Sequence, residues 1–179
     1  LSLIVPSGMI SKKNRTSTQI SPAMKKLLAS LFFVFTTLFT YGQQFHVASY
    51  NVRYANPADE QRGNGWSQRC PVICNQIAYE SFDLVGMQEV LKSQFDDLSN
   101  RLSRDYGCIG VGRNDGKTSG EYAPIFYKKD RFILLDSGCF WLSETPDKPS
   151  VGWDAKYPRI CSWAQLQDRN TGNTLYFLN

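Results

Sequence analysis

Histidine is almost absent from this sequence, because His46 is the only one among its 179 residues. Histidine is the side chain that most often acts as a general base near neutral pH and is also the commonest metal ligand. His46 begins an alternating segment, and by strand parity it lies on the opposite face from Asn51, so it is a poor catalytic candidate. Catalysis by a histidine of this sequence is therefore not expected.

The sequence also lacks a hydrophobic run long enough to cross a membrane, which takes about 20 residues. Its main apolar stretch, Leu27 to Tyr41, has 15 residues and follows Lys25 and Lys26. This pattern, with small residues just before a cut near Gly42, is typical of a secretory signal peptide over residues 24–42. We expect an exported protein, periplasmic or secreted. The alternative interpretation is a buried N-terminal helix.

Acidic residues are missing from the first 42 positions, and this changes the meaning of the net charge. Residues 1–23 are polar and aperiodic, and we interpret them as a non-native upstream extension before a start at Met24. Residues 1–42 hold five of the 20 Lys and Arg and none of the 16 Asp and Glu, so residues 43–179 carry 15 basic and 16 acidic residues. The numbers of charged residues in 43–179 therefore do not predict a basic surface for binding nucleic acid.

Cysteine is sparse and odd in number, with five residues: Cys70, Cys74, Cys108, Cys139 and Cys161. An exported protein can form disulfides, but an odd count leaves at least one thiol without a partner in the chain. Cys70 and Cys74 are four apart on an expected helix, a spacing that rarely meets disulfide geometry and is poor for zinc. We expect most of the five to be small core residues.

The segments that are present predict an α/β chain. Residues 45–52 alternate as a strand, 67–81 form a helix with Ser67 as a candidate cap, and 83–88 form a strand buried on both faces. Further expected elements are a helix at 92–103 and strands at 106–112, 121–129, 131–143, 160–168 and 174–179, the last two as a hairpin. Residues 53–66, 113–120 and 144–159 are expected loops. The order β-α-β-α followed mostly by β indicates packed sheets with helices outside.

Two polar side chains end the first two expected strands. Strand 45–52, helix 67–81 and strand 83–88 have the order and length of a βαβ crossover, which makes the strands parallel. Asn51 and Glu89 then meet at one rim of the sheet, where ligands commonly bind. An amide beside a carboxylate is a suitable place for Mg²⁺, which prefers oxygen ligands and often takes one or two carboxylates. The alternative interpretation, without a function, is that Glu89 is solvated or caps the next helix.

Four motifs, in order, resemble the endonuclease/exonuclease/phosphatase superfamily. They are "YNVR" at 50–53, "MQEV" at 87–90, "GEYAPIFYKKDRFILLDSGCFWLSETP" at 120–146 and "WDAKYPRICSWAQL" at 153–166. The last two are similar to the secreted bacterial branch, and the resemblance runs from about Phe45 to Asn179. It implies a two-sheet β-sandwich with helices on both outer faces, a four-layer α/β fold. It also implies metal-dependent hydrolysis of phosphate esters with Mg²⁺, or alternatively Mn²⁺, as the cofactor.

The resemblance also implies roles for individual residues. Glu89 resembles the metal-binding glutamate, and Asn51 the asparagine that holds the metal site and phosphate. Glu121 resembles the acid that orients a catalytic histidine, Arg159 a phosphate-contacting arginine, and Asn179 the start of an Asn-x-His motif. The alternatives are an edge charge against aggregation for Glu121 and a solvated loop cation for Arg159.

Aromatic residues near Arg159 are candidates for substrate contact. Trp153 and Tyr157 lie in the expected loop beside it, and loop anchoring is the competing interpretation. Trp141 and Trp163 lie in expected strands, and we expect both in the core.

The resemblance implies that further catalytic motifs, including the histidine, lie beyond Asn179. We therefore interpret residues 43–179 as the N-terminal part of the domain, expected to be inactive alone and to lack most of the second sheet. The expected function of the complete protein is hydrolysis of a phosphodiester or phosphomonoester, in nucleic acid, a phospholipid headgroup or a sugar or inositol phosphate. The alternative function is a secreted non-enzymatic module that binds sugar or lipid.

Overall fold

The computed structural model describes residues 21–37 and 44–179, which fall into two units, 1–43 and 44–179. The first unit contains helix α1, Pro22–Thr37, which covers most of the predicted signal peptide. Residues 1–20 of the predicted extension and the predicted cleavage site near Gly42 lie outside the described residues. In the two described ranges, no helix has the length and apolarity needed to cross a membrane.

A four-stranded sheet forms the centre of the second unit, in the order β1-β2-β4-β3. Its strands are β1 (Val47–Asn51), β2 (Leu84–Gln88), β3 (Tyr106–Ile109) and β4 (Ile125–Lys128). Strands β1 and β2 are parallel, with Asn51 opposite Gln88, whereas β4 runs antiparallel to both of its neighbours. The crossover between β1 and β2 contains helix α3, Trp66–Glu80. The predicted βαβ unit is therefore confirmed.

The helices differ from the expectation at their ends. Helix α3 begins at Trp66 after Gly65 and has no side-chain cap, so the proposal that Ser67 caps it is wrong. The expected loop 53–66 contains a short helix α2, Pro57–Gln61, whose first turn is capped by the Asn56 side chain. A proline at the first position and an asparagine before it are strong start signals. The helix after β2 is α4, Lys92–Leu102.

A second sheet contains β5 (Phe132–Trp141), β6 (Ile160–Asp168) and β7 (Thr174–Leu178), all antiparallel. The predicted β6–β7 hairpin is confirmed, and the chain changes sheets in the turn between β4 and β5. Three strands of this sheet are present and pack on the inner face of the first sheet, and the expectation that most of the sheet lies beyond residue 179 stays a prediction.

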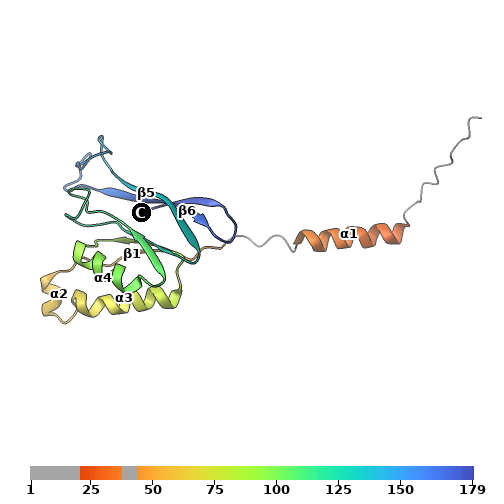
Figure 1. Cartoon of the computed structure of the whole chain (residues 1–179), viewed down its shortest axis with the longest axis horizontal. Helices are drawn as coiled ribbons and strands as arrows, with labels where there is room; N and C mark the ends of the chain where they lie inside the picture. The colour runs from red at the N-terminus through yellow and green to blue at the C-terminus, as the bar shows by residue number, and fades with distance from the viewer. Residues whose placement is uncertain (1–20, 38–43) are drawn as a thin grey trace, which may run out of the picture. The chain divides into compact units, whose positions relative to one another are not determined.

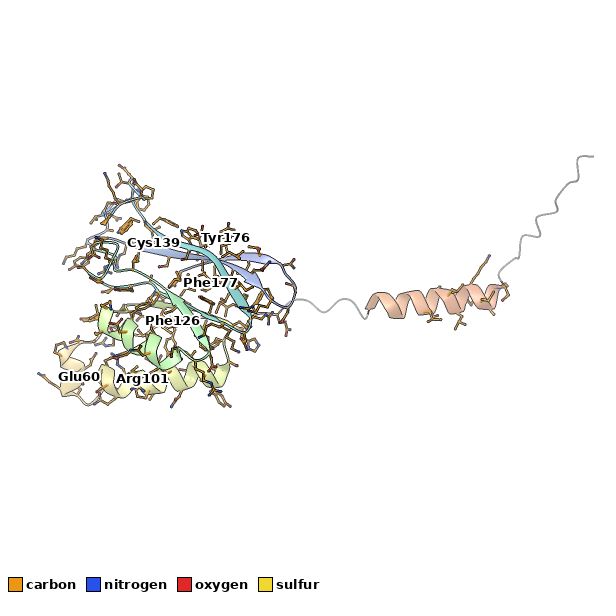
Figure 2. The ribbon with its side chains drawn as sticks, in the orientation of Figure 1. Glu60, Arg101, Phe126, Cys139, Tyr176 and Phe177 are labelled. Atoms are coloured by element: carbon orange, nitrogen blue, oxygen red, sulfur yellow. The ribbon has the colours of Figure 1, made fainter. Side chains whose placement is uncertain are left out.

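Two clusters of buried side chains hold three layers together (Figure 1). The first cluster lies between the first sheet and helices α3 and α4, and it includes Ile77, Met87, Leu98 and Phe126. The second lies between the two sheets and comprises Leu84, Ile125, Phe132, Ala164 and Leu166, with Phe177 packed against it. The labelled Phe126 and Phe177 mark these two interfaces in Figure 2. The two-sheet α/β class is confirmed, and within the described residues helices cover the outer face of the first sheet.

Some individual burial predictions need correction. Trp141 is buried, as expected. Trp163 is only half-buried and packs on Tyr176, with ring centroids 6.3 Å apart, because residues 162, 164, 166 and 168 of β6 are the ones that face inward. Cys70 and Cys74 are buried in the core, while the other three cysteines are half-buried, and all five are free thiols. Burial raises the pKa of the Cys74 thiol to about 12, so this thiol stays protonated and unreactive.

Candidate functional site

Asn51 and Glu89 meet at the rim of the first sheet, as the strand-end argument predicts. Asn51 is the last residue of β1, and Glu89 directly follows β2. The Asn51 Nδ2 group donates a hydrogen bond of 2.9 Å to Glu89 Oε1. The Asn51 Oδ1 atom accepts from the backbone N–H of Arg53 at 2.8 Å. The amide orientation is therefore fixed, with its donor toward the carboxylate.

The backbone at this rim is held in an unusual conformation. Glu89 and Arg53 both have φ of 58°, in the left-handed region that non-glycine residues seldom adopt and that costs about 1–3 kcal/mol each. Such strain persists only when the surroundings fix it, and it concentrates at functional sites. Directly after Glu89, the Val90 carbonyl accepts from the Tyr122 N–H at 2.7 Å. The Glu89 side chain also accepts from the Tyr54 N–H at 3.3 Å.

Gln94, a fully buried residue of α4, fixes the loop that follows β1. Its Oε1 atom accepts from Ala55 N at 2.9 Å and from Leu91 N at 3.1 Å. Its Nε2 atom donates to the Arg53 carbonyl at 3.0 Å. The guanidinium of Arg69, from α3, donates to the same carbonyl and to that of Val52. Two helices thus hold the turn that positions Asn51 and Glu89.

The Arg53 side chain forms a forked ion pair with Asp59 of α2. Arg53 Nε lies 2.6 Å from Asp59 Oδ2, and Nη2 lies 3.0 Å from Oδ1. The hydrogen bond to Arg53 lowers the pKa of the Asp59 carboxyl below its ordinary value, against the opposing effect of burial. The short helix α2 is thereby tied to the rim.

A cleft of about 400 Å³ opens beside Glu89 and gathers most of the predicted site residues. Every side chain that lines it is polar or is a tyrosine: Asn51, Tyr54, Gln88, Glu89, Arg113, Glu121, Tyr157 and Arg159. Glu89, Glu121 and Arg159 also line a smaller adjoining hollow of about 250 Å³. The structure thus brings together five predicted residues, Asn51, Glu89, Glu121, Tyr157 and Arg159, from four separate segments.

Arg113 is a site residue that the sequence reasoning missed. The prediction of residues 113–120 as an exposed turn is wrong at this position, because the Arg113 side chain is only 14% exposed. Its Nη1 atom donates to Glu121 Oε2 at 2.7 Å, and its guanidinium carbon lies 5.5 Å from the centre of the Tyr157 ring. Arg113 and Glu121 are equally distant from the Gly112–Tyr122 bridge. Opposite charges at the two positions next to a bridged pair are a pattern that could have revealed the ion pair.

Asn179 lies apart from the cleft lining, between the two sheets. Its Nδ2 atom donates to the carbonyls of Met87 at 2.8 Å and Pro124 at 3.0 Å. Its Oδ1 atom accepts from Gln88 Nε2 at 2.7 Å. Since Gln88 lines the cleft, Asn179 is connected to the site through one side chain.

Trp153 is not among the residues that line the cleft. It is 76% exposed and has φ of 50° in the loop that also carries Tyr157 and Arg159. A role of Trp153 in substrate contact stays a prediction.

The residues at the rim suit a hard divalent cation. Glu89 offers a carboxylate whose Oε2 atom makes one long contact, and apart from the two arginines the side chains nearby carry oxygen atoms rather than thiols or imidazoles. Such a donor set fits Mg²⁺, which keeps several waters and takes few protein ligands. No cluster of three or more His, Cys, Asp or Glu side chains with metal-binding geometry occurs in the described parts of the chain. Glu89 is therefore a residue that could hold such a cation, with its carboxylate oriented by the Asn51 side chain.

The chain is similar to several solved bacterial structures. One is an endonuclease/exonuclease/phosphatase family protein from Bacteroides thetaiotaomicron, 51% identical, with a TM-score of 0.72 over 74% of this chain and 49% of that one. A mannosyl-6-phosphatase from the same species is 50% identical, with a TM-score of 0.73 over 76% of this chain and 51% of that one. A family protein from Bacteroides vulgatus is 47% identical, with a TM-score of 0.73 over 77% and 52%.

The chain thus spans about half the length of the solved structures that it matches. No profile of a protein family matches the sequence. The likeness nevertheless combines high identity with a shared α/β fold of two sheets and helices over about three quarters of this chain. By sequence and by fold, this chain belongs to the endonuclease/exonuclease/phosphatase superfamily.

Proposed function

We propose that the protein hydrolyses phosphate esters with the help of a divalent metal ion, Mg²⁺ or Mn²⁺, bound at Glu89. The observation that carries this proposal is the polar cleft in which Glu89, Glu121 and Arg159 come together at the rim of the first sheet. The high identity to a protein named as a mannosyl-6-phosphatase supports action on a phosphate ester.

Each side chain of the cleft has a role in this proposal. Arg159 binds a non-bridging oxygen of the substrate phosphate, because a guanidinium matches phosphate geometry. Asn51 orients the Glu89 carboxylate through its 2.9 Å hydrogen bond. A bound divalent cation supplies charge neutralisation at the phosphate and can activate water. Glu121 is the acid that orients a further catalytic group, and Tyr157 forms one wall of the cleft.

The candidate substrates are a nucleic acid, a phospholipid headgroup, and a sugar or inositol phosphate. The balanced charge of residues 43–179 does not favour nucleic acid, which a protein usually attracts through a basic surface. The walls of the cleft carry no aliphatic side chains, although Leu142 and Ile160 line the adjoining hollow, so contact with acyl chains is not favoured in the cleft itself.

The test is a metal-dependence assay on the full-length protein encoded by the gene. We expect release of phosphate, or cleavage of a phosphodiester, in Mg²⁺ or Mn²⁺ and loss of that activity in EDTA. A panel of sugar phosphates, inositol phosphates, a phospholipid headgroup ester and single-stranded DNA would identify the substrate. Binding of a sugar or lipid without turnover in any metal would contradict the proposal and support the binding-module alternative.

A further inference from the structure

Arg113 places an incompletely paired cation in the wall of the cleft. Its guanidinium has one hydrogen-bond acceptor, Glu121, although arginine offers five donors. Its Nε atom is buried and has no partner among the described residues. A half-satisfied buried guanidinium is costly unless a further acceptor arrives. An anionic group of the substrate can reach the part of the guanidinium that lines the cleft, and the fork geometry of arginine allows it to contact a carboxylate and a phosphate together.

Arg113 is also rigidly positioned from three directions. The Glu121 carboxylate holds one end of the guanidinium, the Tyr157 ring lies against its face at 5.5 Å, and its own carbonyl accepts from Trp141 Nε1 at 2.7 Å. A fixed guanidinium loses little side-chain entropy when it binds a ligand. Arg113 therefore has the properties of a prepared anion contact rather than of a mobile surface charge.

The formal charge of the cleft indicates which kind of phosphate ester it takes. The charged side chains that line the cleft are Glu89, Glu121, Arg113 and Arg159, two of each sign. If a divalent cation is bound as proposed above, the site has a net formal charge of +2. A phosphate monoester has a second pKa of about 6 and is a dianion at neutral pH, whereas a diester carries a single negative charge. The monoester matches the charge of the site.

We propose that the cleft selects dianionic phosphate monoesters over diesters, and that Arg113 is the residue that supplies this selectivity by contacting the phosphate beside Arg159. This inference rests on the proposed function. It adds to it a class of substrate and a specificity-determining residue.

The kinetic test compares a monoester and a diester with the same leaving group, p-nitrophenyl phosphate and bis(p-nitrophenyl) phosphate, on the full-length protein. We expect the wild-type protein to prefer the monoester in kcat/KM, and Arg113→Gln to reduce that preference by about tenfold or more, which is about 1.4 kcal/mol. Lys156→Gln is the matched control. Lys156 lies 5.4 Å from the Tyr157 ring but does not line the cleft, so its loss should leave the preference unchanged.

A binding test separates this inference from the proposed hydrolysis. Calorimetry with inorganic phosphate and with dimethyl phosphate, a monoanion, measures the preference for the dianion without any turnover, in the presence and absence of Mg²⁺. Arg113→Gln should weaken the binding of inorganic phosphate much more than that of dimethyl phosphate. If no ester is hydrolysed but this difference appears, the proposed hydrolysis fails, while the preference of the cleft for a dianionic phosphate and the part of Arg113 in it are supported.

A second variant, for which the opposite change in phosphate binding is expected, keeps the test decisive if Arg113→Gln misfolds. Glu121→Gln removes a negative charge next to Arg113 and should strengthen the binding of inorganic phosphate relative to dimethyl phosphate. A fall or no change in that ratio would overturn the inference. A wild-type preference for the diester would also overturn it. So would an equal loss of affinity for inorganic phosphate and dimethyl phosphate in a folded Arg113→Gln protein.

Discussion

At the scale of single residues, the site depends on buried polar side chains that form hydrogen bonds with the backbone. Gln94 is the main example, because its side chain satisfies three backbone groups of the turn after β1 and of the start of α4. Each of these groups would be costly if left without a partner in the interior. The position of Asn51 and Glu89 is therefore set by a residue that contacts neither of them.

Replacing Gln94 with leucine should lower the free energy of unfolding by about 2–5 kcal/mol, since each unsatisfied buried polar group costs about 1–3 kcal/mol. Urea denaturation measures this loss. Gln68→Leu is the control, because Gln68 is exposed on α3, and a surface change of this kind costs at most about 0.5 kcal/mol. Equal stability of the two variants would mean that Gln94 does not hold the turn.

The Arg53–Asp59 pair predicts a pH dependence of stability. The pKa of Asp59 is lowered in the folded protein by its hydrogen bond to Arg53. The pair therefore stabilises the fold fully above the unfolded pKa, about 3.9, and this contribution is lost as the pH falls through the lower folded pKa. The difference in melting temperature between wild-type and Asp59→Asn should be constant between about pH 5 and pH 7 and shrink below about pH 4. A difference that grows on acidification would contradict this assignment.

At the scale of elements, the junction between the two sheets is narrow at Gly86. A Cβ atom on Gly86 would lie 2.7 Å from Asn179 Oδ1, and the Asn179 side chain is held by three hydrogen bonds. The glycine in β2 therefore makes room for a side chain that links β7 to the first sheet.

Gly86→Ala should destabilise the protein by about 1–3 kcal/mol, because the added methyl group has no space. In the double variant with Asn179→Ala, the alanine at position 86 should cost much less than it does alone, because the obstructing amide is gone. A double-mutant cycle by chemical denaturation measures this coupling. Strict additivity of the two changes would show that Gly86 and Asn179 do not pack together.

The elements themselves were largely predictable, since their hydrophobic periods are local properties of the sequence. The strand-end rule placed Asn51 and Glu89 at one rim, and the hydrogen bond between them agrees with it. Helix α2 was missed because five residues are too few to show a helical period. The inward face of β6 was misjudged at Trp163 because both alternating sets of its residues include apolar side chains. Arg113 was missed because its partner and its packing depend on how the 110–122 hairpin folds.

At the scale of the whole molecule, the chain has two units, and export is expected to remove the first and keep the second. The unit of residues 44–179 contains both sheets and the cleft, while the first unit contains α1, which overlaps most of the predicted signal peptide. The inactivity expected of residues 43–179 alone stays a prediction, as does export.

Export predicts a defined N-terminus. Protein recovered from the producing cell should begin near Gln43, because a signal peptidase would cut after the small residues that end at Gly42. N-terminal sequencing of the mature material measures this directly. The presence of residues 1–23 on that material would refute both the cleavage and the interpretation of those residues as non-native.

The central claim is that Glu89 is the metal-binding residue of a phosphate-ester hydrolase. Its most direct test is phosphate-ester hydrolysis in Mg²⁺ by the full-length protein and by its Glu89→Gln variant, a nearly isosteric change at the rim. Glu80→Gln is the control, because Glu80 is exposed at the end of α3. We predict that Glu89→Gln loses at least about a hundredfold in metal-dependent kcat/KM, about 2.7 kcal/mol, and that its melting temperature and the activity of Glu80→Gln are unchanged. Equal hydrolysis by wild-type and Glu89→Gln proteins would contradict the claim and reduce Glu89 to a structural charge.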